Sequence, residues 1–212
     1  RYVMVYNGEV YNYKEIARKL NKANWKSNSD SEVILEAFSR WSFDFVYELN
    51  GMFAITIYDK IKDSLYLFRD RIGIKPLYYY YKDDEFIFAS EIKAIKNLNK
   101  KLSINNHSIY SYLHLGYIPE NLTIYNEISK VKAGHILKYE NKKLVEIAYW
   151  KTDKLIKQDT FGSFEQTKST LNSLITESVK KRLVSDVPIG TFLSGGTDSS
   201  LVTAIAQSLA PE

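Results

Sequence analysis

The sequence predicts an α+β fold in two parts: a first domain over residues 1–150 and the beginning of a second over 163–212. In the first part, short apolar runs separated by turn residues indicate strand hairpins, and amphipathic helices lie between some of them. In the second part, an apolar run is followed by two glycines and a helical pattern, which is the order expected of an α/β unit. The polar, irregular stretch 151–162 is the predicted linker.

The composition is that of a globular protein, because 45% of the 212 residues are hydrophobic and 14% are aromatic. The net charge of +4 is spread along the chain without a basic block, which gives little support to nucleic-acid or membrane binding. The chain has no cysteine, so disulfides and cysteine-based metal sites are excluded within it. No apolar run approaches the ~20 residues of a membrane-spanning helix. We therefore expect a cytoplasmic enzyme.

The first domain begins with a short strand, 2–5, and an amphipathic helix, 13–20. Between them stands the string Tyr-Asn-Gly-Glu-Val-Tyr-Asn, in which the Asn-Gly pair has the spacing and composition of a turn. A second helix is predicted over 32–41, and either Ser29 or Asp30 would be a good N-cap for it.

Two apolar strands, 49–59 and 64–68, follow, and their character suggests packing between layers. The next turn contains Gly73 and Pro76, and we expect Arg69 and Asp70 beside it to pair with backbone groups. The remaining predicted elements of this domain are a hairpin of 79–81 and 86–90, short helices over 91–97 and 108–115, and a last hairpin of 134–139 and 145–150.

The second domain begins with a helix over 164–183 whose apolar stripe is expected to cover a sheet. The stretch 191–200, Thr-Phe-Leu-Ser-Gly-Gly-Thr-Asp-Ser-Ser, then reads as a binding site for the phosphates of a nucleotide. Residues 191–193 suit a buried strand, the two glycines let an anion approach the backbone, and 199–209 alternates as a helix whose N-terminus would face that anion. The Walker lysine is missing, so a simple P-loop ATPase is a poor match. An ordinary Ser/Gly-rich turn is the alternative.

Two strings in the sequence carry a resemblance to one family. The string from Ser194 to Ser200 resembles the pyrophosphate loop of the N-type ATP pyrophosphatases, and the flank 185–190 points to their asparagine synthetase branch. The string from Tyr6 to Tyr13 resembles the glutaminase half of the same family, an N-terminal-nucleophile amidotransferase domain. Further motifs match in the family's order along essentially the whole chain, so it resembles the glutamine-hydrolysing (B-type) asparagine synthetases. Thr197 departs from the pattern, because relatives usually carry an apolar residue there.

The resemblance implies an α/β/β/α sandwich of antiparallel sheets for the first domain, and the start of an ATP-pyrophosphatase (PP-loop) domain for the second. The chain opens on Arg1 inside a strand-like run and stops at Glu212 after one helix. We therefore expect a fragment without the family's N-terminal Cys and without most of its synthetase domain. An oxyanion hole without a nucleophile cannot form a thioester, so the fragment alone is expected to be inactive.

The resemblance also implies a glutamine site at the start of the chain. The side-chain amide of Asn7 and the backbone N–H of Gly8 would stabilise the oxyanion that forms when the amide of glutamine is attacked. Glu9 matches the position that helps to hold glutamine, and Asp30 matches the acid that takes its α-ammonium group. A role of Asp30 as helix cap stays open beside this one.

An ATP site is implied at the other end of the chain. Asp198 is its expected Mg²⁺ ligand, and the alternative for Asp198 is an N-cap of the helix that follows. The residues implied to touch the nucleotide or its pyrophosphate are Leu193, Ser194, Gly195, Gly196, Asp198, Ser199 and Ser200.

The activity implied is synthesis of asparagine from aspartate, glutamine and ATP through β-aspartyl-AMP, with AMP and pyrophosphate as products. The resemblance leaves a homodimer open. An alternative is a related synthetase that acts on another carboxylate, such as a β-lactam-forming enzyme or one of sugar or peptide biosynthesis, since the residues of the acceptor pocket are expected beyond Glu212. A non-catalytic remnant that persists as a binding module is a second alternative.

Overall fold

The computed structural model describes residues 1–98, 100–119, 122–152, 162–185 and 187–210. It divides into two compact units, Arg1–Leu155 and Ile156–Glu212. The predicted linker, 151–162, falls almost wholly outside the described residues, so its boundaries stay a prediction. Within the described ranges, no helix combines the length and the apolar character needed to cross a membrane.

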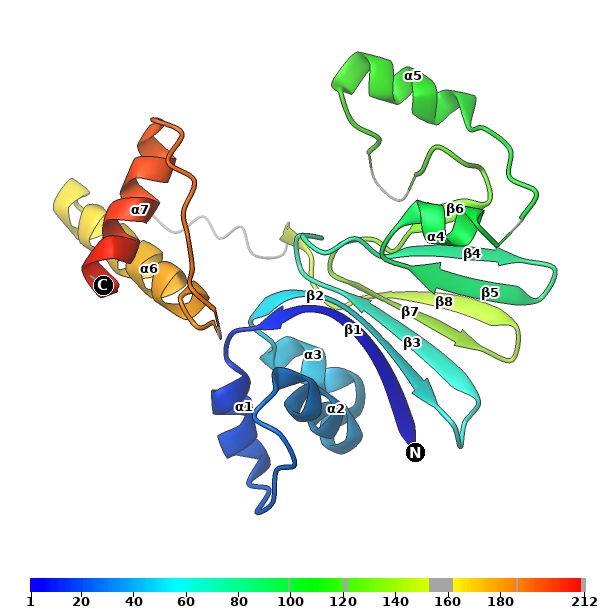
Figure 1. Cartoon of the computed structure of the whole chain (residues 1–212), viewed down its shortest axis with the longest axis horizontal. Helices are drawn as coiled ribbons and strands as arrows, with labels where there is room; N and C mark the ends of the chain where they lie inside the picture. Colours follow the sequence, from blue (N-terminus) through cyan, green and yellow to red (C-terminus); the bar gives the residue numbers. More distant parts are fainter. Residues whose placement is uncertain (99, 120–121, 153–161, 186, 211–212) are drawn as a thin grey trace. The chain divides into compact units, whose positions relative to one another are not determined.

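The strands of the first unit form two antiparallel sheets (Figure 1). The described residues build a five-stranded sheet in the order β1-β2-β3-β7-β8 and a three-stranded sheet in the order β5-β4-β6. The strands are β1 (Tyr2–Val10), β2 (Gly51–Asp59), β3 (Ser64–Arg69), β4 (Tyr78–Lys82), β5 (Glu85–Ala89), β6 (Ile128–Lys130), β7 (His135–Glu140) and β8 (Lys143–Ala148).

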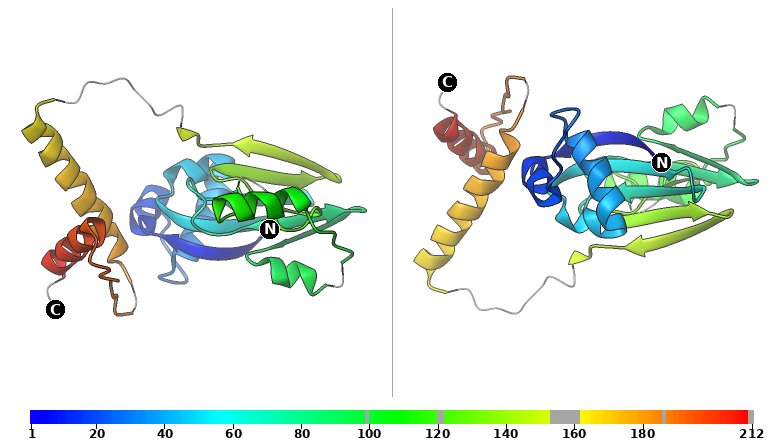
Figure 2. Two further views of the ribbon diagram at one scale, coloured as in Figure 1. Left: turned by 90° about the horizontal axis from the view of Figure 1, so that it is seen from above. Right: turned by 90° about the horizontal axis from the view of Figure 1, so that it is seen from below.

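Helices cover one face of the five-stranded sheet, and the three-stranded sheet covers the other (Figures 1 and 2). The helical segments on the first face are α1 (Tyr13–Leu20), α2 (Asp30–Trp41), a 3₁₀ turn (Ser42–Asp44) and α3 (Phe45–Glu48). Side chains alternate along β2, so Phe53, Ile55 and Ile57 pack against these helices while Ala54 packs toward the second sheet. Two separate cores follow from this alternation.

The core between the sheets contains Leu67 and Leu137 from the large sheet, together with Leu77 and Val131. On the far side of the small sheet, Ile95 of α4 (Ile92–Lys96) packs with Tyr80 and Ile128. The helix α5 (Asn106–Leu115) lies farther along the chain. The order of layers is therefore helix, sheet, sheet, helix, which confirms the predicted α/β/β/α sandwich.

The predicted strands and helices of this unit are found with small shifts in their ends, but the Asn-Gly pair is not a turn. β1 continues through Asn7 and Gly8 to Val10, because β2 offers a backbone partner along its whole length, from the Tyr2–Asp59 pair to the Val10–Gly51 pair. Cross-strand hydrogen bonding thus overrides the local preference of Asn and Gly for turns.

The described part of the second unit contains two helices, α6 (Phe164–Arg182) and α7 (Thr197–Leu209). A capping box formed by Ser163 and Gln166 starts α6. The strand predicted at 191–193 is wrong for this structure: the segment is not in a strand, and Phe192 is 99% exposed. A strand needs a neighbour for its N–H and C=O groups, and no strand is assigned between 162 and 210 in the described part.

The apolar stripe of α6 likewise does not cover a sheet in this structure. Leu171 and Leu174 are 54% and 64% exposed, and Val179 is the buried member of the stripe. The predicted helix is confirmed, but the described residues of the unit contain no sheet that its apolar stripe could cover.

A buried carboxylate joins the elements of the first unit. Asp70, 1% exposed, accepts hydrogen bonds from the backbone N–H groups of Phe53 (3.2 Å), Ile74 (2.9 Å) and Lys75 (2.9 Å). The guanidinium of the preceding Arg69 donates to three backbone carbonyls, those of Gly73, Lys75 and Val131. The sequence-based expectation that these two residues pair with backbone groups is confirmed.

We predict that Asp70→Asn lowers the free energy of unfolding by about 3 kcal/mol, because one carboxylate oxygen becomes an NH₂ group that faces a backbone donor. Urea unfolding followed by circular dichroism measures this loss. Asp83→Asn is the matched control, since Asp83 is exposed in a tight turn with φ of 52°, where Asn is well tolerated. Equal stability of the two variants would contradict the role assigned to Asp70.

Candidate functional site

Strands β1 and β2 approach each other closely at two glycines. A Cβ atom added to Gly8 would lie 2.2 Å from the carbonyl oxygen of Met52, and one added to Gly51 would lie 2.1 Å from that of Glu9. No side chain fits at either position without moving a strand. Gly8, which lies between Asn7 and Glu9 on the edge strand of the described sheet, therefore packs directly against the backbone of β2.

The side chain of Asn7 is exposed and is held by the second sheet. Its Nδ2 donates a hydrogen bond of 3.0 Å to Oγ of Ser90, the residue that follows β5. The two residues are 83 positions apart, and the contact links the edge strand of the large sheet to the end of a strand of the small one. Sequence reasoning missed Ser90, because no local signal marks a contact over such a separation.

Asp30 is tied to β1 from the start of α2. Its Oδ2 accepts hydrogen bonds from the hydroxyl of Tyr6 (2.7 Å) and from the backbone N–H of Val10 (3.1 Å). Ser29 is the N-cap of the helix, and its hydroxyl accepts from the N–H of Ser31. Of the two capping candidates the structure thus selects Ser29, and Asp30 is directed to β1 instead.

The two carboxylate oxygens of Asp30 differ in the length of their hydrogen bonds. Among the described residues, Oδ1 accepts long contacts, of 3.4 Å and 3.5 Å, from the hydroxyls of Ser29 and Ser31. Burial, together with the bond to Asp30, raises the pKa of Tyr6 well above its usual range, so its hydroxyl keeps its proton and remains a donor. The negative charges of Asp30 and Glu9 also contribute to that rise.

The loop that leads to Asp30 is fixed by Glu32. The Glu32 carboxylate accepts hydrogen bonds from the backbone N–H groups of Lys26 (2.9 Å) and Ser27 (2.8 Å), and it pairs with Lys22. The bond from the Lys26 N–H, followed by those from Ser27, lowers the pKa of Glu32 to about 2. The ionised carboxylate therefore fixes the backbone of residues 26 and 27 just before α2, and we call these bonds the Glu32 clamp.

Asp30 and Asn7, both predicted to bind glutamine, lie on different faces of β1. Tyr6 packs with the helices, together with its partner Asp30, while Asn7 projects from the opposite face toward Ser90. The structure therefore brings Asp30 to Tyr6 and Val10 and directs Asn7 to the opposite face of the strand, and Glu9 is half-buried on the same strand.

In the second unit, the loop before α7 has the conformation that its glycines permit. Gly195 has φ of 82°, and Gly196 is the N-cap residue of α7. The hydroxyl of Ser199 donates to the carbonyl of Gly196 and lies 3.0 Å from that of Ser194. Asp198 is in the first turn of the helix and does not cap it, so the capping alternative for Asp198 is wrong.

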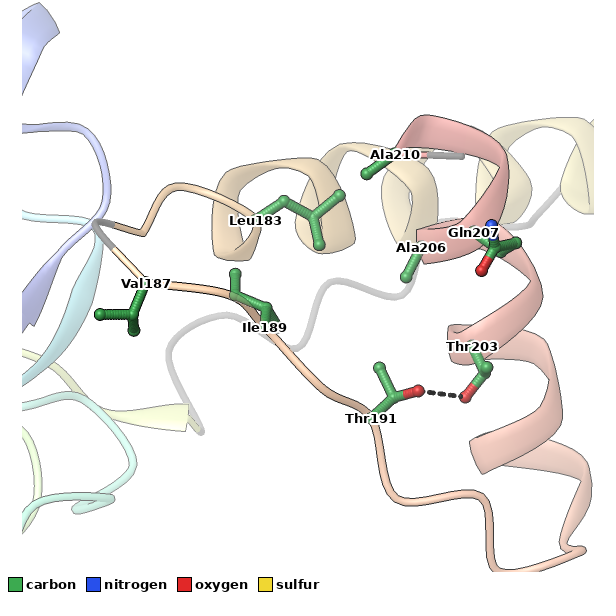
Figure 3. Close-up of a pocket in the computed structure, with 8 residues that line it drawn as sticks. All are labelled: Leu183, Val187, Ile189, Thr191, Thr203, Ala206, Gln207 and Ala210. Atoms are coloured by element: carbon green, nitrogen blue, oxygen red, sulfur yellow. Dashed lines mark hydrogen bonds between the residues drawn. The ribbon is translucent and has the colours of Figure 1, made fainter. Parts of the chain in front are cut away.

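A pocket in the second unit is lined by the residue after α6, by the segment that leads to this loop and by the later turns of α7 (Figure 3). The hydroxyl of Thr203 in α7 donates to that of Thr191 across it, at 3.1 Å. Leu193, at the end of the extended segment, is 62% exposed. The pocket is lined by Leu183, Val187, Ile189, Thr191, Thr203, Ala206, Gln207 and Ala210.

Comparisons with known proteins match both parts of the chain to protein families. Residues 1–150 match the glutamine amidotransferase domain family, and residues 170–212 match the asparagine synthase family. The chain is 41% identical over 209 residues to a putative glutamine-hydrolysing asparagine synthetase 2 of Methanocaldococcus jannaschii, covering 96% of this chain and 40% of that protein. It is 36% identical over 209 residues to the glutamine-hydrolysing asparagine synthetase 3 of Bacillus subtilis, covering 97% of this chain and 34% of that protein. The chain thus spans well under half the length of these relatives.

A solved structure gives an independent view of the fold. Glutamine phosphoribosylpyrophosphate amidotransferase from Bacillus subtilis superimposes with a TM-score of 0.54 at 14% identity, covering 98% of this chain and 44% of that one. At this identity the likeness concerns the fold alone.

We predict that Gly8→Ala destabilises the first unit by about 2–3 kcal/mol, because the new methyl group must displace the backbone of β2. Gly116→Ala is the comparison variant: a Cβ there meets nothing within 4 Å, and only the cost of its φ of 77°, about 1 kcal/mol, is expected. Thermal unfolding of both variants checks the difference, and a smaller loss for Gly8→Ala than for Gly116→Ala would refute it.

The Glu32 clamp predicts a pH dependence. The folded-state pKa of about 2 lies below the ordinary value of 4.5, so the stabilisation is complete above pH 4.5 and is lost as the pH falls toward 2. The gap in melting temperature between wild type and Glu32→Gln should therefore be largest near neutral pH and should close by pH 2. The same comparison with exposed Glu15→Gln should give a much smaller gap at every pH. A gap for Glu32→Gln that does not depend on pH would exclude the clamp.

Proposed function

The chain belongs, over residues 1–150, to the glutamine amidotransferase domain family, and from this premise we propose that this domain hydrolyses the side-chain amide of glutamine. The observation that carries the proposal is the presence on or against β1 of an exposed carboxamide (Asn7), the edge-strand backbone of Gly8 and a carboxylate anchored to the N–H of Val10 (Asp30). These are the groups that an amide oxygen and an α-ammonium group require.

In this proposal the α-ammonium group of glutamine is recognised by carboxylates. Asp30 offers Oδ1, while its Oδ2 is held in place by Tyr6 and Val10. Glu9, on the same strand as Tyr6 and Val10, would add a second negative charge. Charge-assisted hydrogen bonds of this kind are about twice as strong as neutral ones, so the site would select an amino acid over a simple amide.

The amide end of glutamine would be attacked next to Asn7 and Gly8. The family's nucleophile is an N-terminal cysteine, and because this chain contains no cysteine, we place the thiolate on a residue outside it. Its addition to the amide carbon forms a tetrahedral oxyanion, which the Asn7 amide and the Gly8 N–H would stabilise. Collapse of this intermediate breaks the C–N bond, and ammonia leaves with the proton that the thiol gave up when the thiolate formed. Water then hydrolyses the thioester to glutamate and regenerates the thiol.

We propose that the second unit starts a domain that uses ATP to activate a carboxylate. Gly195 and Gly196 leave room for an anion at the N-terminus of α7, since a Cβ at Gly195 would meet nothing within 4 Å. Ser194, Ser199 and Ser200 supply hydroxyls for the pyrophosphate group, and Leu193 is exposed where the base or ribose could contact it. Because the relatives reported above are named asparagine synthetases, we take asparagine as the product, and we propose aspartate as the acceptor with AMP and pyrophosphate as the other products.

The oxygen donors of this loop also fit Mg²⁺. Asp198 would hold the ion with a single carboxylate, leaving the other positions to water and phosphate oxygens, which is the usual arrangement for this ion. When bound, Mg²⁺ supplies charge neutralisation at the phosphates. The chain itself would orient the pyrophosphate through the backbone and hydroxyl groups of the loop.

Asn7→Ala in the full-length protein should lower the turnover number for glutamine hydrolysis by about 100-fold or more, because one donor to the oxyanion is lost. Synthesis from added ammonia should be little changed, since it bypasses this step. Steady-state assays of both activities make the measurement, with exposed Asn97→Ala as the control. Equal loss of the two activities would count against a donor role for Asn7.

Asp198→Asn should leave folding intact and reduce ATP–pyrophosphate exchange steeply, with partial recovery at higher Mg²⁺, because the change removes a charged oxygen ligand. Glu165→Gln alters an acidic residue in the first turn of α6 and serves as the control. A wild-type dependence of exchange on Mg²⁺ in the Asp198→Asn variant would end the metal assignment.

A further inference from the structure

The side chain of Asn7 is exposed at the edge of the large sheet, and a side chain in that situation would ordinarily sample several rotamers. In the described part of the chain it makes a directed contact, the 3.0 Å hydrogen bond from Nδ2 to Oγ of Ser90. We propose that Ser90 is a positioning residue for glutamine hydrolysis, which holds the carboxamide of Asn7 with one N–H engaged and the other directed to the oxyanion. The inference rests on the function proposed above.

Ser90 is itself held on a rigid frame. Ala89, just before it, pairs with Tyr78 in the small sheet, and α4 begins two residues later. Ile95 of α4 is fully buried in the core beneath that sheet. The hydroxyl therefore reaches Asn7 from a point whose backbone is fixed on both sides.

The chemistry of a carboxamide explains why such a partner is useful. The NH₂ group of Asn carries two hydrogens in one plane, so engaging one of them fixes the direction of the other. An oxyanion donor accelerates the reaction only if it is in place before charge develops. Restricting Asn7 beforehand removes a cost in conformational entropy that the reaction would otherwise meet in its transition state.

A purely structural role for the same contact would be to tie the two sheets together. That task is already served at the other end of the sandwich, where the hydroxyl of Tyr81 donates to the carbonyl of Lys142 at 2.6 Å and the side chains of Lys142 and Asp84 pair. The Asn7–Ser90 contact differs because Asn7 directly precedes Gly8, the other donor proposed for the oxyanion.

The test is a double-mutant cycle in the full-length protein, with glutaminase kcat and KM as readouts. Ser90→Ala should lower kcat about tenfold and leave KM within about twofold, because the lost restraint acts on the transition state and not on bound glutamine. In the Asn7→Ala background the same change should have no further effect, since Ser90 acts through Asn7. Ser90→Thr keeps the hydroxyl and should restore most of the activity. Ser129→Ala removes another hydroxyl of the small sheet, one that bonds Tyr79, and should leave kcat unchanged.

The outcomes separate this inference from the function on which it rests. If Asn7→Ala slows hydrolysis while Ser90→Ala does not, or if the two losses are additive, the positioning role is overturned and the proposed function stands. If Asn7→Ala itself has no effect, the proposed oxyanion hole fails. A third outcome is a fall in kcat for Ser90→Ala that is accompanied by a clear fall in melting temperature and is not reversed in Ser90→Thr. That result would assign Ser90 a structural role and overturn the proposal.

Discussion

The buried carboxylate of Asp70 is the constraint on which the first unit depends. It satisfies three backbone N–H groups, and its own carbonyl accepts from those of Gly73 and Gly134, so one residue joins β2, the turn after β3 and the start of β7. A buried charge is tolerable only when it is fully hydrogen-bonded, and here that requirement forces these segments together. Because Phe53, one of the three donors, pairs with Gly8, the constraint extends to the candidate site.

The candidate glutamine site is assembled from separate layers of the sandwich. β1 supplies Asn7 and Gly8, the helical layer supplies Asp30, and the small sheet supplies Ser90. Each group is fixed by the packing of its own layer, so the spacing between them depends on how the layers stack. In the proposed reaction this division matters, because the two ends of one small substrate are recognised by elements that cannot move independently of the core.

In the second unit, the loop before α7 forms although no strand is assigned among the described residues of the unit. Gly195, Gly196 and the hydroxyls of the loop adopt an open arrangement at the start of α7, as their residue types favour. The apolar segment before the loop behaves differently, since Phe192 is exposed and unpaired with any strand of the described residues. Turn and cap preferences are local, whereas a strand exists only with its neighbour.

The sequence by itself determined the elements whose signals are local. The helix 13–20, the hairpins and the backbone role of Arg69 and Asp70 follow from periodicity and turn chemistry, and the structure confirms them. Tertiary structure decided three further points: that the Asn-Gly pair continues a strand, that Ser29 caps α2 while Asp30 binds β1, and that Ser90 meets Asn7. In each case the deciding partner lies on another element of the fold, and a pattern along the chain carries no information about a contact that only packing creates.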